Sequence, residues 1–284
     1  MRFKTVEYKT AKYKTAKYKA VGYTAVLYRH EMKRSLKSFL IWTLCVGFGC
    51  FGCILLYGSL EEEIQGIADS FSELGAMSAA LGMDKMSLAT MRGYFATEIA
   101  MLHSLGGAMY AAALGIGLIS KEQGAHTVDF LNVLPITRGK LLLYKYITLV
   151  TNIFLLNCIC AGLYSLGFIL MKEELCGREM LCYLLAAALM QLEVGTICFL
   201  ISVCTRKTMT GIGLGIAIVF FAMDMMCRIL PAIEKLKYIT PFYFANAADI
   251  FTEGKASVAM VIISTCVILF SLLAAWSIYN RKDL

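Results

Sequence analysis

The chain has few charged residues and very little proline, and together these shortages exclude a soluble globular fold. Charged residues make up 17% of its 284 residues and hydrophobic residues 59%, with a mean hydropathy of +0.68. Soluble domains carry about 25% charged and roughly 45–50% apolar residues. The three prolines, Pro135, Pro231 and Pro241, lie between or at the ends of long apolar segments, where a missing backbone N–H costs little. Uninterrupted segments of this kind predict a membrane protein.

Motifs for catalysis and metal binding are also missing from the sequence. No G-x-x-x-x-G-K-[ST] phosphate-binding loop occurs, so any ATP chemistry has to come from another chain. The sequence has only three histidines, no Ser/His/Asp or H-E-x-x-H arrangement, and no Cys/His cluster with zinc spacing. We therefore expect no catalytic residue, metal site or cofactor in this chain.

Six apolar segments are long enough to cross a bilayer core, which requires roughly 20 helical residues. Helices are expected because backbone amides in lipid must be satisfied within the segment. The predicted fold class is therefore an all-α membrane protein with six transmembrane helices. The predicted spans cover 39–60, 98–119, 146–171, 180–204, 209–231 and 257–279.

The distribution of basic residues predicts the orientation of these spans. Of the 27 Lys and Arg residues, 11 precede the first span and four more follow the second span. The positive-inside rule then places the N-terminus in the cytoplasm, and six spans return the C-terminus to the same side. The first 37 residues are polar and basic, unlike a cleavable signal peptide, so the first span should remain as an anchor. We expect a multi-pass protein of the cytoplasmic (cell) membrane.

Residues 1–27 form a basic tail of low complexity, with a repeated Tyr-Lys-Thr-Ala-Lys unit within residues 8–19. Basic residues next to a membrane attract anionic lipid, so the tail is expected to lie on lipid headgroups or to be a dispensable extension. No folded basic face is present, and a nucleic-acid partner is not expected. Apolar residues at helical spacing over 28–38 then predict an amphipathic elbow helix at the inner interface.

The loop between the second and third spans contains the most informative pattern. Val128, Leu131 and Leu134 are three residues apart, which gives a short helix one apolar face. Pro135 ends that helix, because the residue before a proline is biased away from the α region. A short amphipathic helix at the membrane surface is a docking element for a soluble partner. On spacing alone, an ordinary connecting loop is the alternative.

These residues resemble the signature of type-2 ABC transporter permeases, E-x-x-x-G-T-x-E-x-L-x-x-x-P-[IV]-[ST]-R-x-x-x-x-x-x-K. Two positions depart from it, because His126 replaces the usual glycine and Asp129 replaces glutamate. The segment 30–42 is similar to the elbow helix of the family, and 238–244 to its loop before the last helix. The matching residues are Glu122, Thr127, Phe130, Leu131, Leu134, Pro135, Ile136, Thr137, Arg138 and Lys145.

The resemblance implies that residues 28–284 form a permease domain that pairs with a second copy or a paralogue. Two cytosolic ABC ATPase subunits, which bind ATP and Mg, would dock on it. The segment 127–134 would be the coupling helix, with Phe130 and Leu131 in a groove of the ATPase. The docking residues would be Glu122, Thr127, Asp129, Phe130, Leu131, Pro135 and Arg138.

Three ionisable residues lie inside predicted spans: His103, Glu193 and Asp224. Ionisable groups at such depth are costly and tend to face a cavity, a partner side chain or another subunit. They are candidates for the translocation path, and a buried structural hydrogen bond is the alternative for each. Arg228 is four residues after Asp224 and is positioned to pair with it on a helix.

Two further patterns concern surfaces of the bundle. Glycines at 47, 49 and 52 and at 211, 213 and 215 allow close helix approach, either within one subunit or between the two permeases. In the long loop 61–97, apolar residues at helical spacing from Ile64 to Leu81 predict an amphipathic helix that covers the bundle or gates an exit.

The resulting hypothesis is a permease subunit of an ABC exporter, with amphipathic peptides or hydrophobic drugs as the favoured substrates. One alternative is a secondary transporter that uses Glu193 or Asp224 as a proton or cation site. Another is a membrane sensor or immunity subunit that binds a peptide without moving it.

Overall fold

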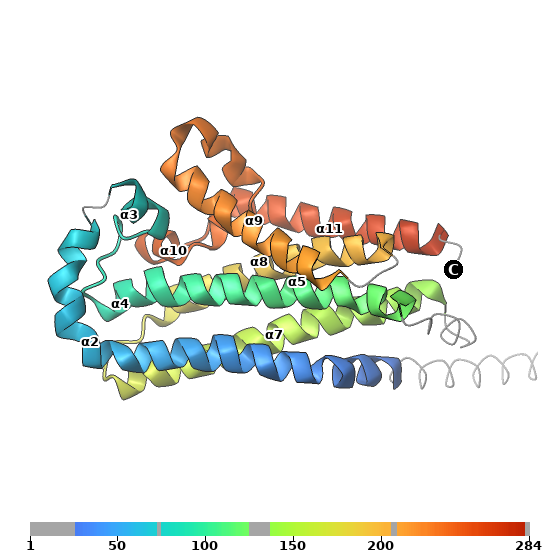
Figure 1. Cartoon of the computed structure of the whole chain (residues 1–284), viewed down its shortest axis with the longest axis horizontal. Coiled ribbons are helices and arrows are strands. Elements are labelled where there is room, and N and C mark those ends of the chain that lie inside the picture. The colour runs from blue at the N-terminus through green and yellow to red at the C-terminus, as the bar shows by residue number, and fades with distance from the viewer. Residues whose placement is uncertain (1–25, 73–74, 125–136, 206–208, 282–284) are drawn as a thin grey trace, which may run out of the picture.

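The described part of the chain is a bundle of long helices (Figure 1). A computed structural model describes residues 26–72, 75–124, 137–205 and 209–281. No strand occurs among these residues. The predicted tail lies almost entirely outside the described residues, as does the predicted coupling helix at 127–134.

Among the described residues, six helices are long and apolar enough to cross a membrane, in agreement with the predicted number of spans. Their outward faces carry large apolar side chains, among them Phe154, Ile169 and Phe270. Such faces suit a lipid environment, where the backbone groups are already paired within each helix. The six helices run over Val26–Leu60, Met91–Lys121, Arg138–Leu170, Gly177–Cys204, Thr210–Ile229 and Val258–Arg281.

The first span is one continuous helix rather than a separate elbow followed by a span. Residues 26–42 are α-helical and continue through the π-helical turn η1 (Thr43–Phe48) into α2 (Gly49–Ser72). Figure 1 shows no bend between residues 26 and 42. The segment 28–38 is therefore helical as predicted, but it is collinear with the span that follows.

The remaining spans are built from five long helices. The second comprises α4 (Met91–Tyr94), the π-helical turn η2 (Phe95–Ile99) and α5 (Ala100–Gly124). The others are α7 (Arg138–Leu170), α8 (Gly177–Cys204), α9 (Thr210–Ile229) and α11 (Val258–Arg281).

The centre of the bundle is the contact between α5 and α8, which is the most extensive between any two described helices. A Cβ atom added to Gly115 would collide with the carbonyl oxygen of Gly195. Two glycines facing each other thus let the two backbones approach closely, as small residues do at helix contacts in membranes. Large buried side chains such as Tyr110, Tyr183 and Phe199 fill the space on either side.

The two ends of the bundle differ (Figure 1). At one end lie the first described residues, the end of α5, the beginning of α7 and the end of α11; we call this the termini end. At the other, the capped end, short elements cover the bundle. They are α3 (Ala76–Leu81), η3 (Pro231–Tyr238), η4 (Tyr243–Ala245) and α10 (Ala247–Glu253).

The apolar spacing in the loop 61–97 predicted one amphipathic helix, but the structure shows two helices with a break between them. Helix α2 extends to Ser72 and a second helix, α3, begins at Ala76. Gly75 between them has a φ of 56° and Gly82 after α3 has a φ of 74°. Residues other than glycine rarely adopt a positive φ, so Gly75 and Gly82 mark the beginning and the end of α3. Helix α3 packs on α9, which places it as a cover over the bundle.

Candidate functional site

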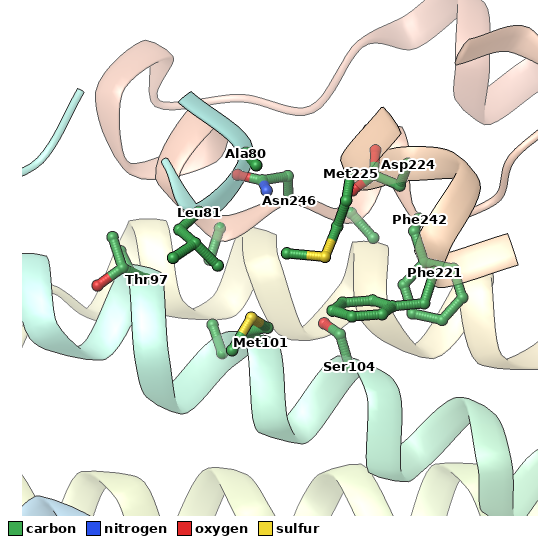
Figure 2. A pocket seen from close by; sticks show the side chains of 14 residues that line it. Ala80, Leu81, Thr97, Met101, Ser104, Phe221, Asp224, Met225, Phe242 and Asn246 are labelled. Atoms are coloured by element: carbon green, nitrogen blue, oxygen red, sulfur yellow. The ribbon is translucent and has the colours of Figure 1, made fainter. Parts of the chain in front are cut away.

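A hollow opens at the capped end between α3, η2, α5, α9 and the segment 242–247 (Figure 2). Most of its lining is apolar, and Leu81, Met101 and Met225 point toward one another across it. The polar side chains at its edge are one carboxylate, one amide and two hydroxyls. The hollow is lined by Ala80, Leu81, Ala96, Thr97, Ala100, Met101, Ser104, Phe221, Asp224, Met225, Phe242, Ala245, Asn246 and Ala247.

Asp224 is the charged residue of this hollow, and Arg228 holds one of its oxygens. The Arg228 Nε donates to Asp224 Oδ2 at 3.3 Å, which confirms the pair predicted from the i, i+4 spacing. Asp224 Oδ1 is buried and has no hydrogen-bond partner among the described residues. A buried oxygen without a donor is costly, so a hydrogen-bond donor on a ligand would be stabilised at this atom.

Arg228 also ties α9 to the cap. Its Nη1 donates to Asp249 Oδ2 at 2.9 Å, and its guanidinium lies 4.4 Å from the ring centre of Tyr243. Asp249 accepts a second charged donor, Lys85 Nζ, at 2.7 Å. That hydrogen bond raises the pKa of Lys85 above its usual value. The network therefore fixes the loop after α3 and helix α10 to the capped end of α9.

Glu193 lies in a different hollow, between α8, α11 and η3. Its side chain is buried, and its Oε2 atom makes no hydrogen bond to any described residue. Ser264 on α11 lines the same hollow, together with Lys237 and Tyr238 of η3. The Ser264 Oγ atom is also buried without a hydrogen-bond partner among the described residues, so no hydrogen bond to this serine supports the structural alternative for Glu193. The unsatisfied oxygen and the hollow leave room for a ligand.

His103 is held in a buried cluster of uncharged polar groups. Its Nδ1 lies 2.9 Å from Tyr164 Oη and its Nε2 lies 3.1 Å from Asn157 Oδ1. Asn157 Nδ2 in turn donates to Gln191 Oε1 at 2.7 Å. Both ring nitrogens are thus satisfied, and the cluster joins α5, α7 and α8. These contacts match the structural alternative for His103.

The structure does not bring the three candidate path residues together. Asp224 and Glu193 line separate hollows, and His103 is enclosed in the core. Sequence reasoning missed Asn157 and Gln191, although uncharged amides in the middle of apolar spans are a recognisable signal for helix contacts.

At the termini end, a buried ion pair joins the first helix to α7. Lys145 Nζ lies 2.9 Å from Glu31 Oε1, and both side chains are almost completely inaccessible. The same ammonium donates to the carbonyl oxygen of Leu118 on α5 at 2.7 Å. One buried cation therefore connects three helices near the loop 125–136.

Other contacts fix the helices that flank this loop. Ser202 Oγ on α8 accepts from the backbone N–H groups of Ile119 and Ser120 at 3.2 and 3.0 Å. Gly139 in the first turn of α7 lies against the Trp276 ring of α11, so closely that a Cβ there would collide with it. The end of α5 is thus packed on α8, and the beginning of α7 is packed on α11.

The predicted docking residues fall mostly outside the described part of the chain. Thr127, Asp129, Phe130, Leu131 and Pro135 are not described. Glu122 lies in the last turn of α5, with a side chain that is not described, and Arg138 is the half-buried first residue of α7. Within the described ranges, no group of three or more His, Cys, Asp or Glu side chains is positioned to hold a metal ion.

Comparison with known proteins agrees with this architecture. Residues 25–284 match a family model described as ABC-2 family transporter protein. A search of curated proteins finds no match to the chain. The family match covers all six spans and both ends of the bundle.

Proposed function

Because the chain belongs to the ABC-2 family of transporter proteins, we propose that it is the permease subunit of an ATP-binding-cassette exporter. The family match over residues 25–284 is the observation that carries the proposal. The six spans form a multi-pass membrane domain of the kind such a subunit needs. ATP and Mg are bound in this proposal by two copies of a separate cytosolic ATPase.

The termini end is proposed to face the cytoplasm and to receive the ATPase. Basic residues concentrate before the first span and after the second, as the positive-inside rule requires for cytoplasmic segments. The helices on either side of residues 125–136, α5 and α7, pack on α8 and α11 through Ser120 and Gly139. A force applied to this loop is therefore passed to the whole bundle.

Pairing with a second permease, either a copy or a paralogue, is supported by glycines that face outward. Gly49 and Gly52 on the first span, and Gly211 and Gly215 on α9, have no atom within 4 Å of an added Cβ. Gly47 and Gly213 instead serve contacts within this chain, to Leu163 and to the Ala112 carbonyl. Outward glycines allow close approach of another helix in lipid.

The substrate class proposed is an amphipathic peptide or a hydrophobic drug. The hollow at the capped end is mostly apolar, and its edge offers a single carboxylate, Asp224. Such a lining fits apolar groups with few hydrogen-bond donors better than a polyhydroxylated glycan.

A secondary transporter is the competing function, and the surroundings of Glu193 favour it. A buried carboxylate with an unsatisfied oxygen beside a hollow is the kind of group that binds a proton or cation inside a membrane. Asp224 is a weaker candidate because Arg228 holds one of its oxygens.

Affinity purification with a co-expressed ATP-binding-cassette ATPase from the same genome tests the proposal. Wild type should retain the ATPase, and a Phe130→Ala/Leu131→Ala variant should lose it by about tenfold or more, as expected when apolar interface anchors are truncated. Leu143→Ala removes an exposed apolar side chain of α7 and is the matched control. Flux driven by a proton gradient through this chain alone would contradict the proposal and support the secondary transporter.

A further inference from the structure

The polar side chains around the hollow at the capped end differ in how far they are bonded. Ser104 Oγ lies 3.0 Å from Tyr183 Oη, and Thr97 Oγ1 donates to a carbonyl oxygen of the preceding turn at 2.9 Å. Asn246 Oδ1 accepts from a backbone N–H at 3.2 Å. Asp224 Oδ1, in contrast, is buried and has no hydrogen-bond partner in the described ranges of the chain. A ligand that supplies the missing donor is therefore stabilised there.

Arg228 leaves this oxygen open because its donors are divided among several acceptors. Its Nε donates to Asp224 Oδ2 at 3.3 Å, its Nη1 to Asp249 Oδ2 at 2.9 Å and its Nη2 to the carbonyl oxygen of Tyr243 at 3.2 Å. An ionised carboxylate offers about four acceptor positions, so one bond uses little of that capacity. The Asp224 side chain is only 8% exposed, so bulk water supplies few of the missing donors. Asp224 is thus fixed by Arg228 on one side and available on the other.

The chemistry of this oxygen determines which ligand group fits it. A carboxylate accepts hydrogen bonds and does not donate them, so the ligand has to carry an N–H or O–H group. A charged N–H donor forms a shorter bond to a carboxylate, roughly twice as strong as the bond from a neutral donor. The second cation of the network, Lys85, lies 2.7 Å from Asp249 and is 43% exposed, so solvent screens its charge. A protonated amine is therefore the group that suits Asp224 Oδ1 best.

The rest of the hollow is apolar and suits a hydrocarbon group. Leu81, Met101 and Met225 point toward one another across it (Figure 2). Methionine side chains are flexible and adapt to apolar groups of different shape. The hollow measures about 410 Å³ with the open space at its mouth included, near the lower end of ligand pockets, which span roughly 300–1,000 Å³. A small amine fits this space better than a whole peptide does.

We infer that the hollow is a binding site for an apolar primary amine. The ammonium group donates to Asp224 Oδ1, and the hydrocarbon part contacts Met101 and Met225. The assignment of this ligand as the transported substrate rests on the proposed function. Within the proposed substrate class, the site selects compounds with an accessible amino group, which are an amine drug or an amphipathic peptide that inserts its amino-terminus or a lysine.

The methyl groups of Met101 and Met225 provide reporters inside the hollow. The full chain is labelled with methionine that carries a ¹³C methyl group and is reconstituted in lipid nanodiscs, and its methyl resonances are recorded by NMR. The chain has 16 methionines, so Met101→Leu and Met225→Leu are used to identify the two signals. Met260, which lines the separate hollow beside Glu193, is the internal reference.

Three ligands with the same hexyl chain separate donor, charge and apolar contact. Hexylamine is protonated at neutral pH and carries charge and donors, hexanol carries a neutral donor, and hexyltrimethylammonium carries charge without a donor. We expect hexylamine to shift the Met101 and Met225 resonances and to leave Met260 unchanged. The other two ligands should need at least about fivefold higher concentrations for half of the shift, because a charged hydrogen bond is lost. Equal potency of either one overturns the inference, and so does a shift confined to Met260.

Asp224→Asn tests the carboxylate itself. The asparagine oxygen keeps an acceptor for Arg228, whereas an amide donor replaces the open acceptor and cannot bind an ammonium. Half of the shift should then need at least about tenfold more hexylamine. Glu98→Gln is the matched control and should titrate like wild type, because Glu98 is a half-buried carboxylate of η2 outside the lining of the hollow.

An unchanged hexylamine titration in Asp224→Asn overturns the inference. A displaced Met260 resonance without ligand reveals a variant that does not fold, and the comparison of the three ligands on wild type then decides.

Co-purification with the ATPase keeps this test separate from that of the proposed function. A chain that retains the ATPase but shows no shift at Met101 and Met225 overturns the inference and leaves the permease function standing. A chain that binds hexylamine but no ATPase overturns the proposed function, and with it the assignment of the ligand as transported substrate. In the wild-type complex, hexylamine should raise the ATPase rate at the concentrations that shift the two resonances, and an unchanged rate overturns the substrate assignment.

Discussion

Asn157 Nδ2 on α7 donates a 2.7 Å hydrogen bond to Gln191 Oε1 on α8, and Asn157 Oδ1 accepts a hydrogen bond from Nε2 of His103 on α5 at 3.1 Å. Three helices that form the centre of the bundle thus meet at one buried polar point. In lipid, where apolar burial does not distinguish protein from surroundings, such contacts and close packing hold helices together.

The first prediction concerns this cluster. Gln191→Leu removes the acceptor of Asn157 and should lower the free energy of unfolding by about 1–2 kcal/mol, the upper range for hydrogen bonds between membrane helices. The effect is measured as a melting temperature, by heating the chain in detergent and determining the fraction that stays soluble. Thr265→Val is the control, because its hydroxyl bonds only within its own helix and is exposed. Equal melting temperatures for both variants would contradict the prediction.

The second prediction concerns the contact of α5 with α8. Gly115→Ala places a methyl group against the Gly195 carbonyl, and backbone cannot yield as a side-chain end can. The change should destabilise the chain by about 1–3 kcal/mol, the usual cost of overpacking. Gly162→Ala, on α7 with no neighbour within 4 Å, should be neutral or slightly stabilising. A melting temperature for Gly115→Ala at or above that of Gly162→Ala would show that the two helices have room to separate.

The six spans were predictable because each is a long apolar segment, and hydropathy is a property of the sequence alone. The third span shows where this reasoning ends. It was predicted to begin at 146, after Lys145, but α7 begins at Arg138. In the sequence a lysine marks the end of an apolar span, but Lys145 is buried within α7, where it pairs with Glu31 from a segment more than a hundred residues away.

The candidate site was less predictable, because its residues are defined by tertiary contacts. The spacing of Asp224 and Arg228 predicted their pair, since both lie on one helix. The spacing of residues along the sequence did not indicate that Asp249 and Lys85 extend this ion pair into a network, because the two residues come from separate segments of the cap. The break at Gly75 was likewise hidden, since apolar periodicity continued across it while the positive φ of the glycine interrupted the helix.

The third prediction concerns the pH dependence of the cap. The hydrogen bond to Asp249 raises the pKa of Lys85 above its usual value of 10.5. The stability contributed by this pair is therefore fully present below pH 10.5 and is lost as the pH rises through the higher pKa of the folded state. Melting temperatures of wild type and Lys85→Met should differ at pH 8 and converge at higher pH.

Lys255→Met provides the control for that experiment, because Lys255 is an exposed lysine that lies between α10 and α11 at the same, capped end of the bundle. Its melting temperature should follow that of wild type across the whole range. Added salt should also reduce the difference between wild type and Lys85→Met, because the Lys85 side chain is 43% exposed and its charge is partly screened. A difference that grows with pH would contradict the assignment of the pair.

The fourth prediction separates the exporter from the secondary transporter at Glu193. Glu193→Gln keeps the size of the side chain and one acceptor oxygen, replaces the other oxygen with an amide donor and removes the ability to ionise. If ATP drives transport and Glu193 is a structural residue, the ATPase rate of the complex should stay within about twofold of wild type, because ATP is bound and hydrolysed on the separate ATPase subunit. If the carboxylate is a proton or cation site, the same change should abolish gradient-driven flux. The neighbouring Ser264→Ala, which alters the same hollow without removing a charge, distinguishes loss of the ionisable group from a local change of shape.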